Sequence, residues 1–178
     1  MMRSKFLALL CAAFLITLTG CSAVPIEEYA ENSPALVAET FFSGELIASG
    51  IVKDRSGRVI RYFNAIIDAS WEGGVGTLDE QFVFDDGEEQ TRVWTLERTA
   101  AGAYIATAGD VIGESQMKVL GNSLFMQYVL RIPYGDGTID VNVDDRMYLV
   151  SDTVLLNESV MSKWGFNVGQ ITLVIQKK

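Results

Sequence analysis

The stretch SLFMQYVLRIPYGDGTIDVNV, residues 123–143, alternates apolar and polar side chains on both sides of a glycine-rich turn. A period of two residues is typical of a β-strand that buries one face, and the turn glycines suit a tight antiparallel connection. The run 138–150 continues this period beyond the turn. The stretch therefore predicts a β-hairpin. The buried face of its first strand, 123–132, is predicted to carry Leu124, Met126, Tyr128, Leu130 and Ile132.

The same period recurs along the chain, with turn signals about every 8 to 15 residues. Short, evenly spaced strands of this kind are typical of an antiparallel barrel or sandwich. Because closing the sheet removes its unpaired edges, we expect an all-β fold with a single up-and-down β-barrel of about 8 to 10 strands. The further strand-like runs occupy 42–52, 59–71, 76–85, 90–98, 103–112, 153–161 and 168–176.

The N-terminus has the pattern of a bacterial lipoprotein precursor. Arg3 and Lys5 precede an uncharged apolar run over residues 6–16, too short for a bilayer, which needs roughly 20 apolar residues. Leu18-Thr19-Gly20-Cys21 then fits the lipobox, in which small residues precede the cysteine that accepts a diacylglyceryl group. We expect residues 1–20 to be removed and Cys21 to anchor the protein through two or more acyl chains. The alternative is an ordinary secretory signal with a chance cysteine.

The segment after the cysteine predicts location and domain boundaries. Ser22 stands where an aspartate often signals inner-membrane retention, so we expect the outer membrane, facing the periplasm. Residues 21–38 are predicted to form a tether, and residues 39–178 the barrel. Because Pro34 fits the first position of a helix, Ser33-Pro34 predicts one short helical turn through Ala38.

Composition excludes several classes of chemistry. The chain has no histidine and two cysteines, of which Cys11 leaves with the signal and Cys21 is consumed by lipid. This removes Ser-His-Asp triads, Cys-His dyads, disulfides and ordinary zinc sites, so we expect no metal, no cofactor and no enzyme activity. The net charge of −9 argues against nucleic acid and against electrostatic binding to anionic lipid.

Three charged residues fall in the apolar phase of predicted strands. Glu80 is in register with Phe82, Arg92 with Trp94, and Asp145 with Val143 and Met147. The runs 76–85 and 90–98 are hairpin neighbours, so Glu80 and Arg92 are expected to face each other inside the barrel. An unpaired buried charge costs several kcal/mol, which favours their pairing. The pair is either the polar floor of a ligand site or a structural latch.

The aromatic side chains leave two interpretations of the interior. Phe82, Trp94 and Tyr128 either line an apolar cavity or fill a solid barrel, since barrels of this size can do both. The segment 163–166, Lys-Trp-Gly-Phe, is predicted to pack over an open barrel end, with a lid or a membrane-touching tip as the alternatives. Neither Asp85-Asp86 nor Asp144-Asp145 places two carboxyl groups on one face, which argues against glycosidase chemistry.

A string of motifs extends over residues 38–178, namely FSG (42–44), GIVKDRSGR (50–58), GTLDEQF (76–82), DG (86–87), RVW (92–94), DVIG (110–113), GN (121–122), YVL (128–130), DDRMYL (144–149) and MSKWGF (161–166). Together these motifs resemble the DUF3833 family of bacterial lipoproteins. Arg146 departs from the family pattern, which commonly has a tryptophan there. The resemblance implies a lipocalin-like barrel of unknown function, and family genes near fatty-acid modification genes favour a lipid or acyl ligand.

The sequence therefore predicts a lipid-anchored barrel that binds or shuttles a small hydrophobic ligand in the cell envelope. One alternative is an interaction lipoprotein whose solid barrel docks an envelope protein. Another is an enzyme acting on lipid, with Glu80 or Asp145 as its base. The expected partners are the membrane, through the anchor, and the ligand. The candidate binding residues are Phe82, Trp94, Tyr128, Glu80, Arg92 and Asp145.

Overall fold

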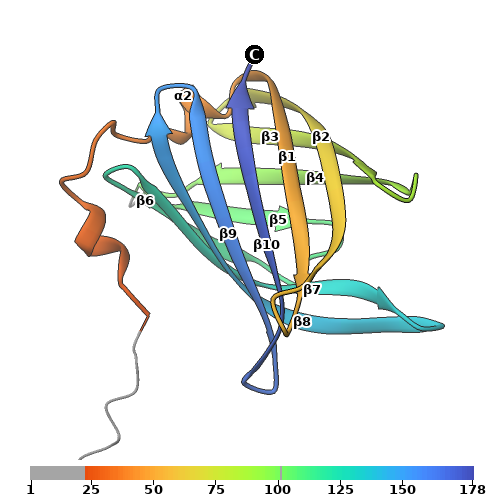
Figure 1. Cartoon of the computed structure of the whole chain (residues 1–178). Helices are drawn as coiled ribbons and strands as arrows, with labels where there is room; N and C mark the ends of the chain where they lie inside the picture. Colours follow the sequence, from red (N-terminus) through yellow and green to blue (C-terminus); the bar gives the residue numbers. More distant parts are fainter. Residues whose placement is uncertain (1–22, 101) are drawn as a thin grey trace, which may run out of the picture.

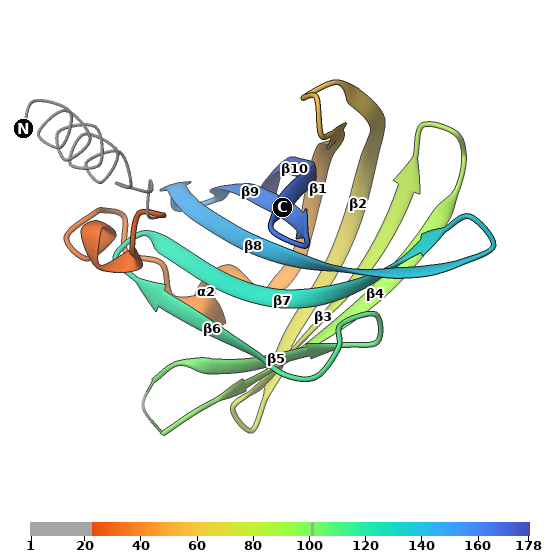
Figure 2. The ribbon, with the colours of Figure 1, turned by 90° about the horizontal axis from the view of Figure 1, so that it is seen from below.

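The computed structural model describes residues 23–100 and 102–178, so the predicted signal peptide and Cys21 lie outside the described residues. Ten antiparallel strands form a closed barrel, in which each strand pairs with its neighbours in the chain (Figures 1 and 2). The strands are β1 (Gly44–Asp54), β2 (Val59–Glu72), β3 (Val75–Phe84), β4 (Glu89–Arg98), β5 (Tyr104–Ala108), β6 (Ser115–Leu120), β7 (Ser123–Tyr134), β8 (Gly137–Ser151), β9 (Val154–Lys163) and β10 (Phe166–Lys177).

Pairing of β1 with β10 closes the barrel. Their ladder runs from Leu46 opposite Lys177 to Asp54 opposite Gly169. Closure gives every strand of the barrel a paired neighbour on each side, which is the condition that favoured a barrel over an open sheet. The predicted all-β, up-and-down barrel with a short helical turn is confirmed.

The period of two correctly predicted which side chains point inward. Along β2, Phe63, Ala65, Ile67 and Ala69 are buried and alternate with exposed residues. The predicted inward face of β7 also lies in or against the core. Alternation arises because successive side chains of a strand point to opposite faces of the sheet.

One strand was missed, and another is shorter than predicted. β6 was not expected, and β5 ends at Ala108, where the sequence predicts a run through residue 112. The chain leaves β5 because residues 110–112 bond to β7 instead. Arg131 N donates to Asp110 O at 2.8 Å, and Ile112 N donates to Val129 O at 2.9 Å.

The helical turn lies four residues later than predicted. It is α2 (Ala38–Phe41), so β1 begins at Gly44 and not at Phe42 as the predicted run had it. The segment before α2 stays extended because Leu36 N donates to Gly121 O at 2.8 Å. No helix among residues 23–100 and 102–178 is both long enough and apolar enough to cross a membrane.

α2 closes one end of the barrel (Figure 1). Phe41 and Phe42 are buried in the core cluster, and Trp71 Nε1 donates to Phe42 O at 2.7 Å. The carbonyl oxygens at a helix C-terminus lack intrahelical partners. Here Lys177 Nζ from β10 supplies them, donating to Thr40 O at 2.9 Å, Phe41 O at 3.0 Å and Ser43 O at 2.9 Å. The last strand, β10, therefore holds α2 over this end of the barrel.

The residues before α2 pack on the outside of the barrel. Tyr29, in the 3-10 helix Ile26–Tyr29, contacts the rings of Phe125 at 5.6 Å and Tyr148 at 5.3 Å. Arg146 lies over the Phe125 ring at 4.6 Å and donates from Nη1 to Val24 O at 2.9 Å. The guanidinium thus packs over the Phe125 ring and ties the outer segment to β8.

A substitution of Gly121 tests how closely this outer segment packs against the barrel. The φ of Gly121 is +55°, and an added Cβ would lie 1.7 Å from Tyr29 O. We expect Gly121→Ala to lower the free energy of unfolding by roughly 2 to 4 kcal/mol. The matched control is Gly135→Ala, whose φ is +57° with nothing within 4 Å, and which should cost about 1 kcal/mol. Denaturant titrations followed by tryptophan fluorescence would measure both; equal losses would contradict the close contact.

Candidate ligand-binding cavity

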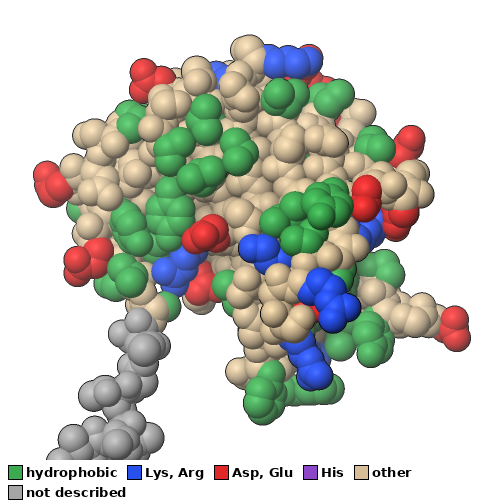
Figure 3. Space-filling view, in the orientation of Figure 1, with side chains coloured by type: hydrophobic (Ala, Val, Ile, Leu, Met, Phe, Trp, Pro, Cys, Tyr) green, Lys and Arg blue, Asp and Glu red, His purple; other side chains and the backbone are tan. Residues whose placement is uncertain are grey.

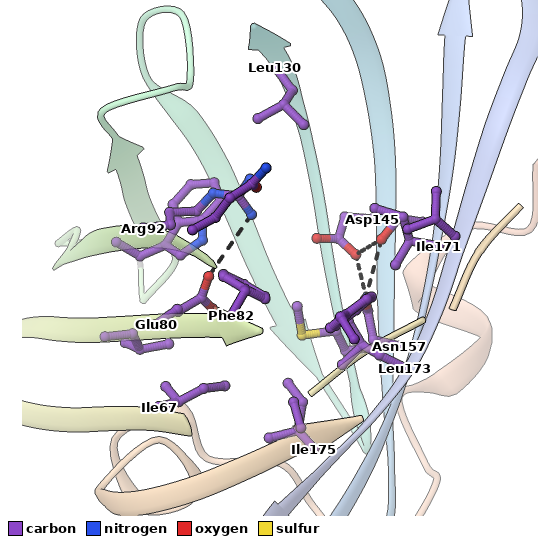
Figure 4. A pocket seen from close by; sticks show the side chains of 18 of the residues that line it. Ile67, Glu80, Phe82, Arg92, Leu130, Asp145, Asn157, Ile171, Leu173 and Ile175 are labelled. Atoms are coloured by element: carbon purple, nitrogen blue, oxygen red, sulfur yellow. Dashed lines mark hydrogen bonds and ion pairs between the residues drawn. The ribbon is translucent and has the colours of Figure 1, made fainter. Parts of the chain in front are cut away.

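The barrel is hollow. A cavity of about 490 Å³ is lined by side chains from every strand except β5 (Figure 4). Phe42 lies at its closed end, beneath α2. Its mouth is formed by residues next to the β1–β2, β3–β4 and β7–β8 turns, namely Val52, Ile60, Arg61, Phe84, Glu88, Gln90, Ile132 and Pro133. The volume falls in the range of about 300 to 1,000 Å³ that is typical of small-molecule sites.

The cavity wall is largely apolar and deformable. Trp94 packs edge-on against Tyr128 at 5.3 Å, and Phe63 against Phe82 at 5.7 Å. The predicted ligand-facing aromatics therefore line the cavity. Methionine is flexible and polarizable, so it adapts to ligands of irregular shape. All four methionines of the described chain line the wall: Met117, Met126, Met147 and Met161.

Glu80 and Arg92 face each other inside the barrel, as the hairpin register predicts. They are directly opposite in the β3–β4 ladder, with Arg92 Nη1 3.9 Å from Glu80 Oε2. Arg92 makes its shorter contacts with Asp110 from the β5–β6 loop. Its Nε donates at 3.1 and 3.0 Å to the two carboxylate oxygens, and its Nη2 donates to Oδ2 at 2.7 Å. The guanidinium therefore binds Asp110 through its Nε–Nη2 edge, and its Nη1 lies beside Glu80.

Asp145 lies on the opposite wall of the cavity (Figure 4). It is only 5% exposed, and its Oδ1 accepts hydrogen bonds from Asn157 Nδ2 and, at 2.9 Å, from Ser159 Oγ. The Tyr128 hydroxyl donates to Oδ2 over a longer distance of 3.4 Å. In the part of the chain that the structure describes, no cationic side chain forms an ion pair with Asp145.

The environment shifts the proton affinities of these groups. Burial raises the pKa of Glu80 to about 7, against the opposing effect of the Arg92 guanidinium, and the charge of Asp145 adds to the rise. Burial likewise raises the pKa of Asp145, although hydrogen bonds from Asn157, Ser159 and Tyr128 oppose it. The pKa of Tyr128 lies well above its ordinary value, first through burial and then through the charge of Asp145. Near neutral pH, Glu80 therefore exchanges between its charged and neutral forms.

Arg61 lies at the mouth. Its Nη2 is 2.9 Å from both Asp86 Oδ1 and Glu88 Oε2, and both acids are in the β3–β4 turn. The guanidinium carbon lies 3.7 Å from the centre of the Phe84 ring. Stacking and two ion pairs hold Arg61 against one side of the mouth.

The structure brings all six predicted binding residues to one cavity, and it adds partners that the sequence analysis missed. Asn157 and Ser159 are in phase with the buried Leu155 and Met161 on β9, so the period of two could have found them. Arg61 is similarly in phase with Phe63. The period of two could not place Asp110 beside Arg92, because Asp110 lies in the β5–β6 loop.

The sequence analysis predicts that segment 163–166 packs over an open barrel end, and this prediction is wrong. The segment forms the β9–β10 turn, and Trp164 is 83% exposed and Phe166 74% exposed. Among residues 23–100 and 102–178, no group of three or more acidic or sulfur side chains is arranged to hold a metal ion.

Two solved structures share the fold. The S-type phycobiliprotein lyase CpeS from Guillardia theta matches with a TM-score of 0.56 and 10% identity, over 87% of this chain and 94% of that chain. A protein of unknown function from the DUF3598 family, from Nostoc punctiforme, matches with a TM-score of 0.57 and 14% identity over 88% of this chain. The match spans 53% of that second chain. These likenesses show the fold alone, a lipocalin-like barrel.

No curated protein matches the sequence. The family model described as "Protein of unknown function (DUF3833)" matches residues 15–177, which include all ten strands of the barrel. The chain therefore belongs to the DUF3833 family, as its motifs predict.

Proposed function

We propose that this protein binds a small hydrophobic ligand, a lipid or fatty-acyl compound, inside its barrel and carries it within the cell envelope. Lipid on Cys21 holds the protein at the membrane, in our proposal at the outer membrane and facing the periplasm. The anchor rests on the lipobox pattern of Leu18-Thr19-Gly20-Cys21. The proposal that the barrel binds a ligand rests on its cavity.

The cavity volume of about 490 Å³ is the single observation that favours ligand binding over a solid, structural barrel. Protein interiors are ordinarily packed as densely as organic crystals, with few voids larger than a water molecule. A void of this size in an apolar wall leaves side chains without packing partners, and an apolar ligand restores those contacts. The open mouth between the hairpin turns provides a route for entry.

The distribution of polar groups supports an amphiphilic ligand. Glu80 and Arg92 lie on one wall and Asp145 on the other, while the remaining wall is mostly apolar. Small-molecule sites commonly combine an apolar lining with a few polar groups that fix orientation. The apolar body of the ligand would contact the methionines and Phe82, with its polar end between the two polar walls.

A tryptophan placed inside the cavity should compete with the ligand for space. We expect Ile171→Trp, on the cavity side of β10, to weaken binding of the neutral fluorophore Nile red about tenfold or more. Val174→Trp adds the same side chain to the outer face of the same strand and should leave binding unchanged. Fluorescence titration of the full-length protein after gentle detergent extraction would measure both.

Native mass spectrometry of the extracted protein is the direct test for a natural ligand. We expect a fraction of the wild-type protein to carry a lipid-sized adduct that Ile171→Trp lacks. Recovery of only empty protein, together with no binding of Nile red or of any lipid in a panel, would overturn the proposed function.

A further inference from the structure

We propose that the polar end of the ligand is cationic, a protonated amine and not a free carboxylate. This inference rests on the proposed ligand-binding function and names the chemical class that the cavity selects. It is carried by the placement of charges on the two polar walls of the cavity, which contain more carboxylates than cations (Figure 4).

Arg92 is already occupied. Its Nε and Nη2 bind both oxygens of Asp110, in the two-pronged geometry that suits a carboxylate. Its remaining nitrogen, Nη1, faces Glu80 at 3.9 Å. A fatty-acid carboxylate entering the cavity would find the Nε and Nη2 side of the guanidinium taken by Asp110, and at Nη1 it would lie beside the Glu80 carboxyl group.

The acids exceed the cations around this part of the cavity. Glu80, Asp110 and Asp145 carry three carboxyl groups, and Arg92 carries the one guanidinium among them. One carboxylate oxygen of Asp145 points across the cavity toward the Glu80 wall (Figure 4). A ligand carboxylate would add another negative charge to this apolar enclosure, whereas an ammonium group would offset a charge already there.

The hydrogen-bonding capacity of Asp145 agrees with this assignment. Its Oδ1 accepts two bonds, while Oδ2 has only the long contact of 3.4 Å from the Tyr128 hydroxyl. An ionised carboxylate oxygen can accept two hydrogen bonds, so Oδ2 has room for a stronger donor. A primary ammonium carries three N–H donors and can bridge the Asp145 and Glu80 walls.

One side of the mouth, next to the β3–β4 turn, favours the same charge. Asp86 and Glu88 lie along its β3–β4 side, and Arg61 is held between them by ion pairs of 2.9 Å. Asp85 and Glu89 belong to the same turn region. A cation approaching this side meets an acidic rim before it reaches the interior acids.

Three straight-chain amphiphiles of equal length test the inference: dodecylamine, dodecanol and dodecanoate. Each would be titrated below its micelle concentration against Nile red bound to the extracted full-length protein. We expect dodecylamine to displace the dye at about tenfold or more lower concentration than dodecanoate, with dodecanol between them. Equal or stronger displacement by dodecanoate would overturn the inference and leave the proposed function standing. If none of the three displaces the dye and no lipid binds, the proposed function itself fails.

Asp145→Asn removes the charge with little change of shape. We expect it to bring the affinity for dodecylamine close to that for dodecanol, while the affinity for dodecanol changes little. Asp68→Asn is the matched control, because Asp68 is exposed on the outer face of β2 and lies outside the cavity lining. Loss of amine preference in the control but not in Asp145→Asn would contradict the assignment.

The pH dependence of the wild-type protein supplies a test that needs no variant. Glu80 has a pKa of about 7, so it becomes charged as the pH rises from about 6 to about 8. A fatty ammonium keeps its proton over this range, since alkyl ammonium pKa values lie near about 10. We therefore expect the affinity for dodecylamine to rise with pH and that for dodecanol to stay level; a fall for the amine would overturn the inference. The groups that bear on Glu80 charge are Arg92, Asp145, Asp110, Asp79 and Tyr128.

A separate observation, the exposed aromatic tip of the β9–β10 hairpin, carries a second inference. We infer that this tip and the β1–β2 turn beside it dock on the surface of an anionic phospholipid bilayer. Trp164 and Phe166 are exposed and belong to the β9–β10 hairpin, which is the lowest hairpin in Figure 1, and hydrophobic side chains cover that tip in Figure 3. Aromatic residues of this kind are enriched at membrane–water interfaces.

The charge next to the tip complements an anionic surface. The β1–β2 turn carries Lys53, Arg55 and Arg58, and Lys163 lies 5.5 Å from the Trp164 ring. Within the described residues, none of these four cations forms an ion pair with an acidic side chain. Although the chain as a whole is acidic, this edge is locally basic, and local clusters of Lys and Arg are attracted to anionic lipid.

Trp164 can report its own insertion, because Trp94 is buried and Trp71 is half-buried. In full-length protein reconstituted into phosphatidylglycerol vesicles, we expect a blue shift of tryptophan emission and quenching by brominated lipid, both absent in Trp164→Phe. Phosphatidylcholine vesicles should give a smaller effect. Arg55→Glu should reduce the signal, whereas Lys118→Glu, away from the tip, makes the same charge change and should not. No shift of the emission in anionic vesicles, or equal effects of the two charge variants, would overturn the inference that this tip docks on the bilayer.

Discussion

The hydrogen-bonded ladder between β1 and β10 is the constraint on which the rest of the structure depends. It pairs the first and last strands from Leu46 to Asp54, so the sheet closes and has no free edge. The diameter of a closed barrel grows with the number of strands, and eight strands give an interior that side chains can just fill. Ten strands give a wider ring, and the cavity of about 490 Å³ follows from that width. Lys177, at the end of the same ladder, binds the carbonyl groups of α2, so closure also holds α2 in place.

A hollow interior changes what buried charge costs. In a packed core, a carboxylate without a cation would be strongly unfavourable, and a close partner would be required. Arg92 and Asp110 satisfy that requirement for each other. Glu80 has a cation only at 3.9 Å and Asp145 has none in an ion pair within the described residues, so neither charge is fully compensated. Burial without full compensation raises the pKa of both carboxyl groups. A proton or a bound cation can supply the missing compensation, which is why the same two residues link the stability of the empty barrel to its choice of ligand.

The sequence was sufficient for the fold and for part of the site, for identifiable reasons. The alternation of strands such as 123–132 predicted their buried faces, and the short Asp85-Asp86-Gly87 turn fixed the register that places Glu80 opposite Arg92. β6 was missed because it is only six residues long and three of its first four residues, Ser115, Gln116 and Lys118, are polar. Asp110 could not be predicted, since its approach to Arg92 depends on the path of a loop. Whether the barrel is hollow depends on strand number and tilt, which no local pattern specifies.

The mouth of the cavity has opposite character on its two sides, and this asymmetry connects the interior to the surface. Asp86 and Glu88 make the β3–β4 side acidic, while the β1–β2 turn is basic and adjoins the exposed Trp164 and Phe166. A lipid surface that attracts the basic and aromatic side would leave the acidic side facing water, because anionic headgroups repel carboxylates. In that orientation an amphiphile would leave the bilayer past the aromatic tip and meet the acidic rim with its polar end. The charge of its polar end would then be selected at two places, first at the acidic rim and again between Glu80 and Asp145, while its apolar chain fills the cavity of the barrel.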